Sequence, residues 1–162
     1  IVIAGCKMPA IDNLEEDYRM KIAKQLLHDK RRPGIFAVSP DATVFQALQL
    51  MAEKDIGALL VMDNDQLVGI FSERDYARKV VLQGKTSAST PIRDIMTAKV
   101  VFARPDSSID ECMALMSERR IRHLPVLDNG NVVGVLSITD LVRAQIAEQQ
   151  FVIEQLEHYI HG

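Results

Sequence analysis

Two stretches of this sequence repeat one another and decide its fold. Pro40–Arg78 reads PDATVFQALQLMAEKDIGALLVMDNDQLVGIFSERDYAR, and Pro105–Arg143 reads PDSSIDECMALMSERRIRHLPVLDNGNVVGVLSITDLVR. The stretches align without gaps at an offset of 65 residues, and about 15 of the 39 columns are identical. Self-similarity over a whole segment indicates two copies of one structural unit, called copy one and copy two below.

Each copy begins with the pattern of a short strand followed by a helix. Apolar residues recur at helical spacing in both copies: Val44, Ala47, Leu48, Met51 and Ala52 in copy one, and Ile109, Cys112, Met113 and Met116 in copy two. A carboxylate before a helix can accept the free N–H groups of the first turn. We therefore expect Asp41 and Asp106 to cap these helices.

A β-hairpin and a second helix complete each copy. Buried strands are predicted at Leu59–Met62 and Leu124–Leu127, with return strands at Val68–Phe71 and Val133–Leu136. Asp128-Asn129-Gly130 has the residues that a tight hairpin turn prefers. The second helices should begin at about Glu73 and about Thr139. One copy alone would leave half of its sheet uncovered, so we predict a mixed α/β (α+β) fold with two units packed as a pseudo-twofold pair.

The flanking segments add helices to this pair. Asn13–His28 has the spacing of an amphipathic helix, with Leu14, Tyr18, Ile22 and Leu26 on one face. The last helix of copy two should continue to Tyr159, with an apolar stripe that has no partner inside the copy and suggests a homodimer. The stripe comprises Ile146, Ile153, Leu156 and Ile160. The predicted organisation is an N-terminal extension (1–33), copy one (34–83), a linker (84–91), copy two (92–146) and a C-terminal helical extension (147–162).

Composition narrows the classes of partner. The 162 residues carry a net charge of −3, which argues against nucleic acid as the main partner. No apolar run approaches the roughly 20 residues that span a bilayer, so we expect no membrane partner. Two cysteines without a CxxC motif favour a reducing, cytoplasmic setting. The first residue is Ile rather than Met, so a removed targeting segment stays open.

The strongest family signal is a motif that closes both hairpins, Gly-h-h-Ser/Thr-x-x-Asp, where h is apolar. It occurs at Gly69–Asp75 and Gly134–Asp140, and Asp94–Thr97 and His123–Val126 accompany it. Over Gly34–Ile146 the sequence resembles a pair of cystathionine beta-synthase-type (CBS) domains, also called a Bateman module. Its length and tail resemble the stand-alone CBS-pair proteins, which have no catalytic domain.

The resemblance implies a regulatory site for an adenosyl ligand, such as AMP, ADP, ATP, NAD or S-adenosylmethionine, between the copies. In such a site an ionised aspartate can accept from both ribose hydroxyls. A serine or threonine hydroxyl at a helix start suits a phosphate. The adenine then requires an apolar slot and backbone hydrogen bonds.

The resemblance places one site at each motif, with both copies contributing. The first would take Ser137, Thr139 and Asp140, with Val44, Ile56, Gly57 and Ala58 around the base and Arg122 near phosphate. The second would take Ser72, Arg74 and Asp75, with Ala98, Lys99, Ile109, Ile121, Arg122 and His123 from copy two. By residue type the second site has more positive charge and suits a phosphate better.

Plainer interpretations stand beside these assignments. The motif serines and aspartates can be helix caps, and His123 can be a core residue. The basic stretch His28–Arg32 could contact phosphate or nucleic acid, but it is most simply a solvated turn before Pro33. No histidine spacing predicts a metal site, and neither a nucleophile elbow nor a phosphate-binding GxxxxGK[ST] loop occurs. We expect a sensor without enzymatic activity or a catalytic cofactor. The alternatives are a structural interaction module with vestigial sites and a nucleic-acid-associated regulator that uses Lys30–Arg32.

Overall fold

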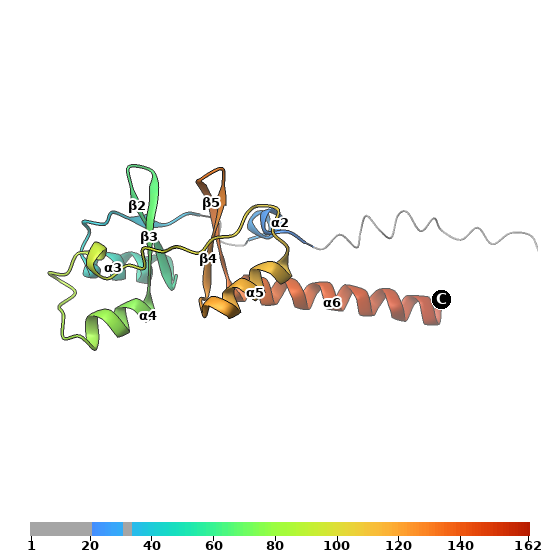
Figure 1. Ribbon diagram of the computed structural model, residues 1–162. Coiled ribbons are helices and arrows are strands. Elements are labelled where there is room, and N and C mark those ends of the chain that lie inside the picture. The colour runs from blue at the N-terminus through green and yellow to red at the C-terminus, as the bar shows by residue number, and fades with distance from the viewer. Residues whose placement is uncertain (1–20, 31–33) are drawn as a thin grey trace, which may run out of the picture.

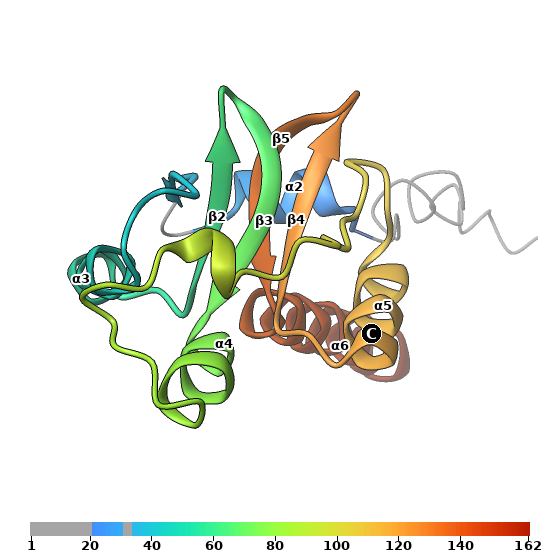
Figure 2. The ribbon, with the colours of Figure 1, turned by 60° about the vertical axis from the view of Figure 1, so that its left-hand side comes forward.

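The computed structural model describes residues 21–30 and 34–162. Two units lie side by side, each built on a β-hairpin with helices packed around it (Figures 1 and 2). Copy one has a sheet of order β1-β2-β3, and copy two has the pair β4-β5. The mixed α/β pair of repeated units predicted from the sequence is confirmed.

Corresponding elements of the two copies have similar bounds. Copy one contains β1 (Ala37–Val38), α3 (Val44–Lys54), β2 (Ala58–Asp63), β3 (Gln66–Ser72), α4 (Glu73–Asp75) and the π-helix η1 (Tyr76–Val81). Copy two contains α5 (Ile109–Arg119), β4 (His123–Asp128), β5 (Asn131–Ser137) and α6 (Ile138–His161). Its first strand is reduced to a parallel bridge between Ala103 and Val126. Two short helices precede the copies, α2 (Ala23–His28) and the 3-10 helix η2 (Ile92–Asp94).

The hairpin turns follow from residues that tolerate positive φ. Asn64 and Asp65 have φ of 47° and 64°, and Asn129 and Gly130 have 49° and 83°. Two consecutive positive values are the backbone of a type I′ turn, whose twist matches that of the flanking strands. The turns set a register that pairs Ala58 with Ser72 and His123 with Ser137. Each motif serine thus lies beside the first residue of the preceding strand.

The helix caps differ from the sequence prediction. Thr43 and Ser108, two residues after the expected aspartates, cap α3 and α5 by accepting the backbone N–H groups of Gln46 and Glu111. The side chains of Gln46 and Glu111 in turn accept the backbone N–H groups of Thr43 and Ser108, which completes a capping box at each helix. The prediction for Asp41 and Asp106 was wrong because the helices begin later. Asp41 instead forms an ion pair with Arg93, and Asp106 forms one with Arg104.

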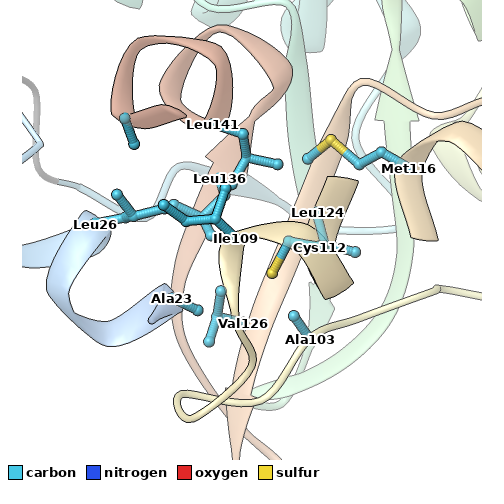
Figure 3. Packing of buried hydrophobic residues seen from close by; sticks show 11 residues of the cluster. Ala23, Leu26, Ala103, Ile109, Cys112, Met116, Leu124, Val126, Leu136 and Leu141 are labelled. Carbon is cyan, nitrogen blue, oxygen red and sulfur yellow. The ribbon is translucent and has the colours of Figure 1, made fainter. Parts of the chain in front are cut away.

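Each copy has its own apolar core, and each core takes residues from the segment that precedes the other copy. The core of copy one contains Phe71 and also Ile92 and Ile95, which precede the second repeated stretch, Pro105–Arg143. The core of copy two contains Leu136 and also Ala23 and Leu26 of α2, as Figure 3 shows. This exchange joins the two units, because neither core is complete without the chain leading to its neighbour.

The motif glycines allow this exchange. A Cβ on Gly134 would lie 2.5 Å from Leu27 Cδ2, and one on Gly69 would lie 2.5 Å from Met96 Sδ. Both distances are well inside van der Waals contact, so the crossing segments rest directly on the return strands. Glycine in the motif therefore has a packing role in both copies.

The terminal helices agree only in part with the prediction. α6 runs from Ile138 to His161, so the expected long C-terminal helix is confirmed. At the N-terminal side, α2 begins at Ala23, while Ile22 is extended and bridges to Ser108. Ile22 therefore does not continue the predicted helical face. Residues 13–20 of that predicted helix lie outside the described residues.

Candidate functional site

Both copies of the Gly-h-h-Ser-x-x-Asp motif form the same strand-to-helix turn. Ser72 and Ser137 are N-caps whose hydroxyls accept the backbone N–H of Asp75 and Asp140, at 3.3 and 3.2 Å. In return, Oδ2 of each aspartate accepts the backbone N–H of the serine, at 3.0 and 2.8 Å. The capping interpretation is thus confirmed for both motifs, and it leaves the second carboxylate oxygen, Oδ1, unused.

In copy one the second oxygen is already bonded. Lys79 Nζ lies 2.8 Å from Asp75 Oδ1, and the Thr97 hydroxyl donates to the same oxygen at 3.2 Å. The Asp75 side chain is 12% exposed. Lys79 also donates to the Ile95 carbonyl at 3.0 Å, which holds the ammonium group over the carboxylate. The protein's own groups thus occupy this carboxylate.

In copy two the second oxygen lacks this kind of pairing within the described part of the chain. Among the residues that the structure describes, none donates a hydrogen bond to Asp140 Oδ1, while Lys30 Nζ lies 3.1 Å from Oδ2. The side chain is 19% exposed and lines a cleft. Asp140 therefore presents an unused acceptor to a space that a ligand could enter.

The cleft lies between the copies and has a volume of about 880 Å³. Copy one contributes Lys54, Asp55, Ile56, Gly57, Ala58, Leu59, Leu60 and Ile70 to its walls. Copy two contributes His123, Val135, Ser137, Thr139, Asp140 and Arg143. The chain that leads into copy one contributes Lys30, Gly34 and Phe36. This size and mixture of apolar and polar walls are typical of small-molecule sites. A second cavity of about 470 Å³ lies between the Phe102–Ser107 segment and α5.

Among the described residues, Lys30 is the cation that pairs with the Asp140 carboxylate. Its Nζ donates to the Val135 carbonyl at 2.7 Å while it pairs with Asp140. Burial alone would raise the pKa of Asp140. The Ser137 N–H, the charge of Lys30 and their hydrogen bonds more than offset that effect, so the pKa lies below its ordinary value of 3.8. Asp140 is therefore ionised near neutral pH.

His123 stands across the cleft from Gly57. A Cβ at Gly57 would lie 3.3 Å from His123 Cε1, so the imidazole packs where residue 57 has no side chain. Burial lowers the pKa of His123 below 6.5, with Lys30 and Arg122 adding to the shift and Asp140 opposing it. The imidazole is therefore largely neutral at pH 7.

The structure brings together most residues predicted for the first site. Ser137, Thr139 and Asp140 line the cleft with Ile56, Gly57 and Ala58. His123, predicted for the second site, lies in this same cleft. Ser72, Arg74 and Asp75 line neither of the two cavities described above. Arg74 instead donates to the Arg120 carbonyl at 2.7 Å.

Six other predicted residues lie elsewhere. Val44 and Ile109 are the first residues of α3 and α5, belong to the two cores with 0% and 4% exposure, and line neither cavity. Ile121 packs against the core of copy two. Ala98, Lys99 and Arg122 are exposed and do not line either cavity. The phosphate contact of Arg122 stays a prediction, and its charge acts on His123 at the cleft.

Several cleft residues were not among the predicted site residues, including Lys30, Phe36, Lys54 and Arg143. Lys30 stood in the basic stretch interpreted as a solvated turn, and its pairing with Asp140 corrects that interpretation. Lys54 Nζ lies 5.9 Å from the centre of the Phe36 ring, a cation–π contact that forms one wall. No local motif marked Arg143.

Neither a metal centre nor a membrane segment is found in the described part of the chain. Across residues 21–30 and 34–162, no three His, Cys, Asp or Glu side chains gather as metal ligands would. None of the helices there has the length and hydropathy of a membrane-spanning segment. The cleft is thus built from apolar walls, hydroxyls, an open carboxylate and cations.

A paired α/β module with a cleft between its copies is the class of protein that this fold and site define. The chain matches the CBS domain family over residues 29–82 and again over 92–147. It belongs to that family and contains two CBS domains.

Individual relatives agree with this assignment. The chain is 39% identical over 127 residues to a mitochondrial CBS domain-containing protein of Arabidopsis thaliana, which covers 75% of this chain and 62% of that protein. The chain therefore spans less than two thirds of that relative. A solved protein with CBS domains from Burkholderia ambifaria is 53% identical, with a TM-score of 0.75, and the match covers 80% of this chain and 96% of that one.

One solved relative contains ligands. The CBS domain pair of protein MJ0100 was solved in complex with 5-methylthioadenosine and S-adenosyl-L-methionine. It is 28% identical, with a TM-score of 0.70, and the match covers 80% of this chain and 98% of that one.

Proposed function

We propose that this chain is a regulatory sensor that binds an adenosyl ligand in the cleft at Asp140. The observation that carries the proposal is the unused Oδ1 of Asp140, an ionised acceptor at the wall of a cleft between the copies. Support also comes from the relative solved with two adenosyl compounds. The residues that would bind the ligand are the predicted Ile56, Gly57, Ala58, His123, Ser137, Thr139 and Asp140.

The chemistry of the walls matches the parts of a nucleotide. Ribose hydroxyls would donate to Asp140, and charge-assisted bonds of this kind contribute about 1.5–3 kcal/mol. Ile56, Ala58 and Ile70 offer an apolar slot for the base. The hydroxyl of Thr139 lies in the first turn of α6, where the N–H groups of Ile138 and Asp140 already donate to Arg122 and Ser137, so a phosphate would use this hydroxyl and the helix dipole.

Charge supports a phosphate-bearing ligand. Lys30, Lys54 and Arg143 line the cleft against the carboxylates Asp55 and Asp140. An excess of cations favours AMP, ADP, ATP or NAD over the cationic S-adenosylmethionine. This reverses the prediction that the Asp75 site suits phosphate better, because Asp75 is paired with Lys79. We therefore propose one working site per chain.

Lys30 supplies a route from binding to regulation. A ribose that bonds to Asp140 competes with Lys30 for the carboxylate. Lys30 follows Asp29, the C-cap of α2, and α2 packs on β5 and α6. A change in the position of the Lys30 side chain would therefore alter the packing of α2 on copy two. A partner protein could recognise that change in packing. Couplings of this kind are typically about 1–3 kcal/mol.

The remaining predictions stay part of the proposal. We propose a homodimer without catalytic activity, acting on a protein target, and a cytoplasmic location stays a prediction. Lys30 is committed to Asp140 and Val135 in the described residues, so it is a poor anchor for nucleic acid. A structural interaction module with vestigial sites is the alternative that an experiment must exclude.

Calorimetric titration tests the proposal. Ligand-stripped protein would be titrated in turn with AMP, ATP, NAD and S-adenosylmethionine. We expect micromolar binding of at least one phosphate-bearing compound, at one site per chain. Silence with all four, from protein that unfolds in a cooperative thermal transition, would contradict the sensor and favour the structural module.

A further inference from the structure

From Val142 onward, α6 presents an apolar stripe to solvent. Val142, Ile146, Ile153, Leu156 and Ile160 are 40%, 50%, 54%, 56% and 73% exposed. Figure 1 shows the helix running past α5 and α2 into solvent. The last residue of α6 in the core of copy two is Ala144. A helix with a solvated apolar face gains little stability by itself, so this stripe needs a partner.

The spacing of the stripe is that of a coiled coil. With Gln149 included, the positions alternate in steps of four and three residues from Val142 to Ile160. This is a heptad seam, with Ile146, Ile153 and Ile160 at a positions and Val142, Gln149 and Leu156 at d positions. A strict seven-residue repeat favours a left-handed pair of helices.

The charges beside the seam indicate which partner fits. Arg143 and Glu157 occupy e positions, and within residues 21–30 and 34–162 neither forms an ion pair. The seam is symmetric about Phe151, so a second α6 running in the opposite direction places each a residue opposite a d residue. That orientation also sets e beside e, which brings Arg143 next to Glu157 of the second copy, twice.

A parallel pair fits these charges less well. It would place Val152 beside Glu157 and Gln145 beside Gln150, with no ion pair along the seam. Its one advantage is that the two Gln149 amides could bond to each other, whereas the antiparallel pair faces each with Ile153. Two symmetric ion pairs and a complete a-to-d seam favour the antiparallel pair, and Gln149 can extend its amide to the edge of the seam.

We propose that α6 binds the α6 helix of a second copy as an antiparallel two-stranded coiled coil over residues 142–160, flanked by two Arg143–Glu157 ion pairs. This rests on the proposed homodimer and not on nucleotide binding. The paired length is about 27 Å at 1.5 Å per residue. Arg143 also lines the cleft, so the pair places an acidic residue of the second copy near the nucleotide site.

Light scattering of the full chain without nucleotide tests the pairing. We expect a dimer for the wild type, a monomer for Ile153→Asp, and a dimer for Gln155→Asp, which adds the same charge away from the seam. Arg143→Glu should raise the dimer dissociation constant about two- to thirty-fold, the range for two exposed ion pairs, and Glu157→Arg in addition should restore it. A monomeric wild type or a dimeric Ile153→Asp protein would overturn the proposal.

Oxidative cross-linking tests the orientation, in a Cys6→Ser background. Gln150→Cys should form a disulfide dimer, because only the antiparallel pair sets residue 150 beside itself. Ile160→Cys should not, because only a parallel pair brings residues 160 together, and the reverse result would overturn the orientation. Calorimetry on Ile153→Asp distinguishes this proposal from the proposed sensor. If the variant is monomeric and still binds nucleotide, the substitution has affected dimer formation alone.

Discussion

The two copies share a motif and a capping box but differ in what neutralises the motif aspartate. In copy one the cation is Lys79, one turn further along the same helical segment. In copy two the equivalent position is the small, buried Ala144, and the cation is Lys30, from the segment before copy one. Asp75 is therefore paired with a lysine close to it in the sequence. Asp140 is paired with a lysine far from it in the sequence, so this ion pair links two separate parts of the chain.

The helices after the two motifs differ as well. After copy one the chain forms a three-residue α4 and then a π-helix, η1, and Lys79 lies within it. After copy two the chain forms one regular helix of 24 residues, α6. The same capping turn is therefore followed by a short helical segment that ends at Val81 in copy one and by a long, exposed helix in copy two. The two copies thus share the hairpin and the capping turn, and the residues around each motif determine whether its aspartate is paired locally or faces the cleft.

The largest expected effect tests whether the two cores unfold as one. Phe71 and Leu136 are equivalent, fully buried positions. Phe71→Ala should cost about 3–5 kcal/mol and Leu136→Ala about 2–5 kcal/mol, measured by urea unfolding. Because each core contains residues from the segment before the other copy, we expect one shared transition in each variant. Two separated transitions would show that the copies fold independently.

A smaller effect separates the two motif glycines. Gly134→Ala and Gly69→Ala both overpack a crossing segment, at a typical cost of about 1–3 kcal/mol. We expect the greater loss for Gly134→Ala, because the branched Leu27 adapts less easily than the flexible Met96. Thermal unfolding of the two variants checks the order, and an equal or reversed order would contradict the packing argument.

The helix caps should show the smallest loss of stability and no difference between copies. Thr43→Ala and Ser108→Ala each remove one bond of a capping box, which typically costs about 1 kcal/mol. Asp41→Ala and Asp106→Ala serve as controls, because these exposed residues do not cap, and should change the free energy of unfolding by less than about 0.5 kcal/mol. A larger loss in the aspartate variants would restore their predicted role.

The pKa values of His123 and Asp140 test the role of Lys30 at the cleft of copy two. The pKa of His123 is lowered, so its contribution to stability is complete above its unfolded value of 6.5 and is lost as the pH falls below that value. Asp140 has the same sign, at pH values below 3.8. Lys30→Ala should raise both pKa values, and proton NMR of His123 measures the first. An unchanged His123 pKa would show that Lys30 does not act on the cleft; Lys79→Ala is the matched control.

The repeat predicted most of the fold, since hairpins, turns and the long last helix all follow from local residue patterns. The resemblance to CBS domains, rather than the repeat alone, predicted Asp140, Ser137 and Thr139 at a cleft between the copies. It failed for Lys30, because that residue lies outside the repeat and reaches Asp140 only through tertiary packing. It failed for Val44 because a first-turn residue pointed into the core.

Equilibrium titration of two matched variants with the preferred nucleotide is the most direct test of the difference between the motifs. Asp140→Asn and Asp75→Asn each remove one negative charge from an equivalent capping box. We predict about a 10- to 100-fold loss of affinity for Asp140→Asn, the equivalent of a lost charge-assisted bond, and a change within about threefold for Asp75→Asn. Equal losses, or a greater loss in Asp75→Asn, would contradict a single open site in copy two.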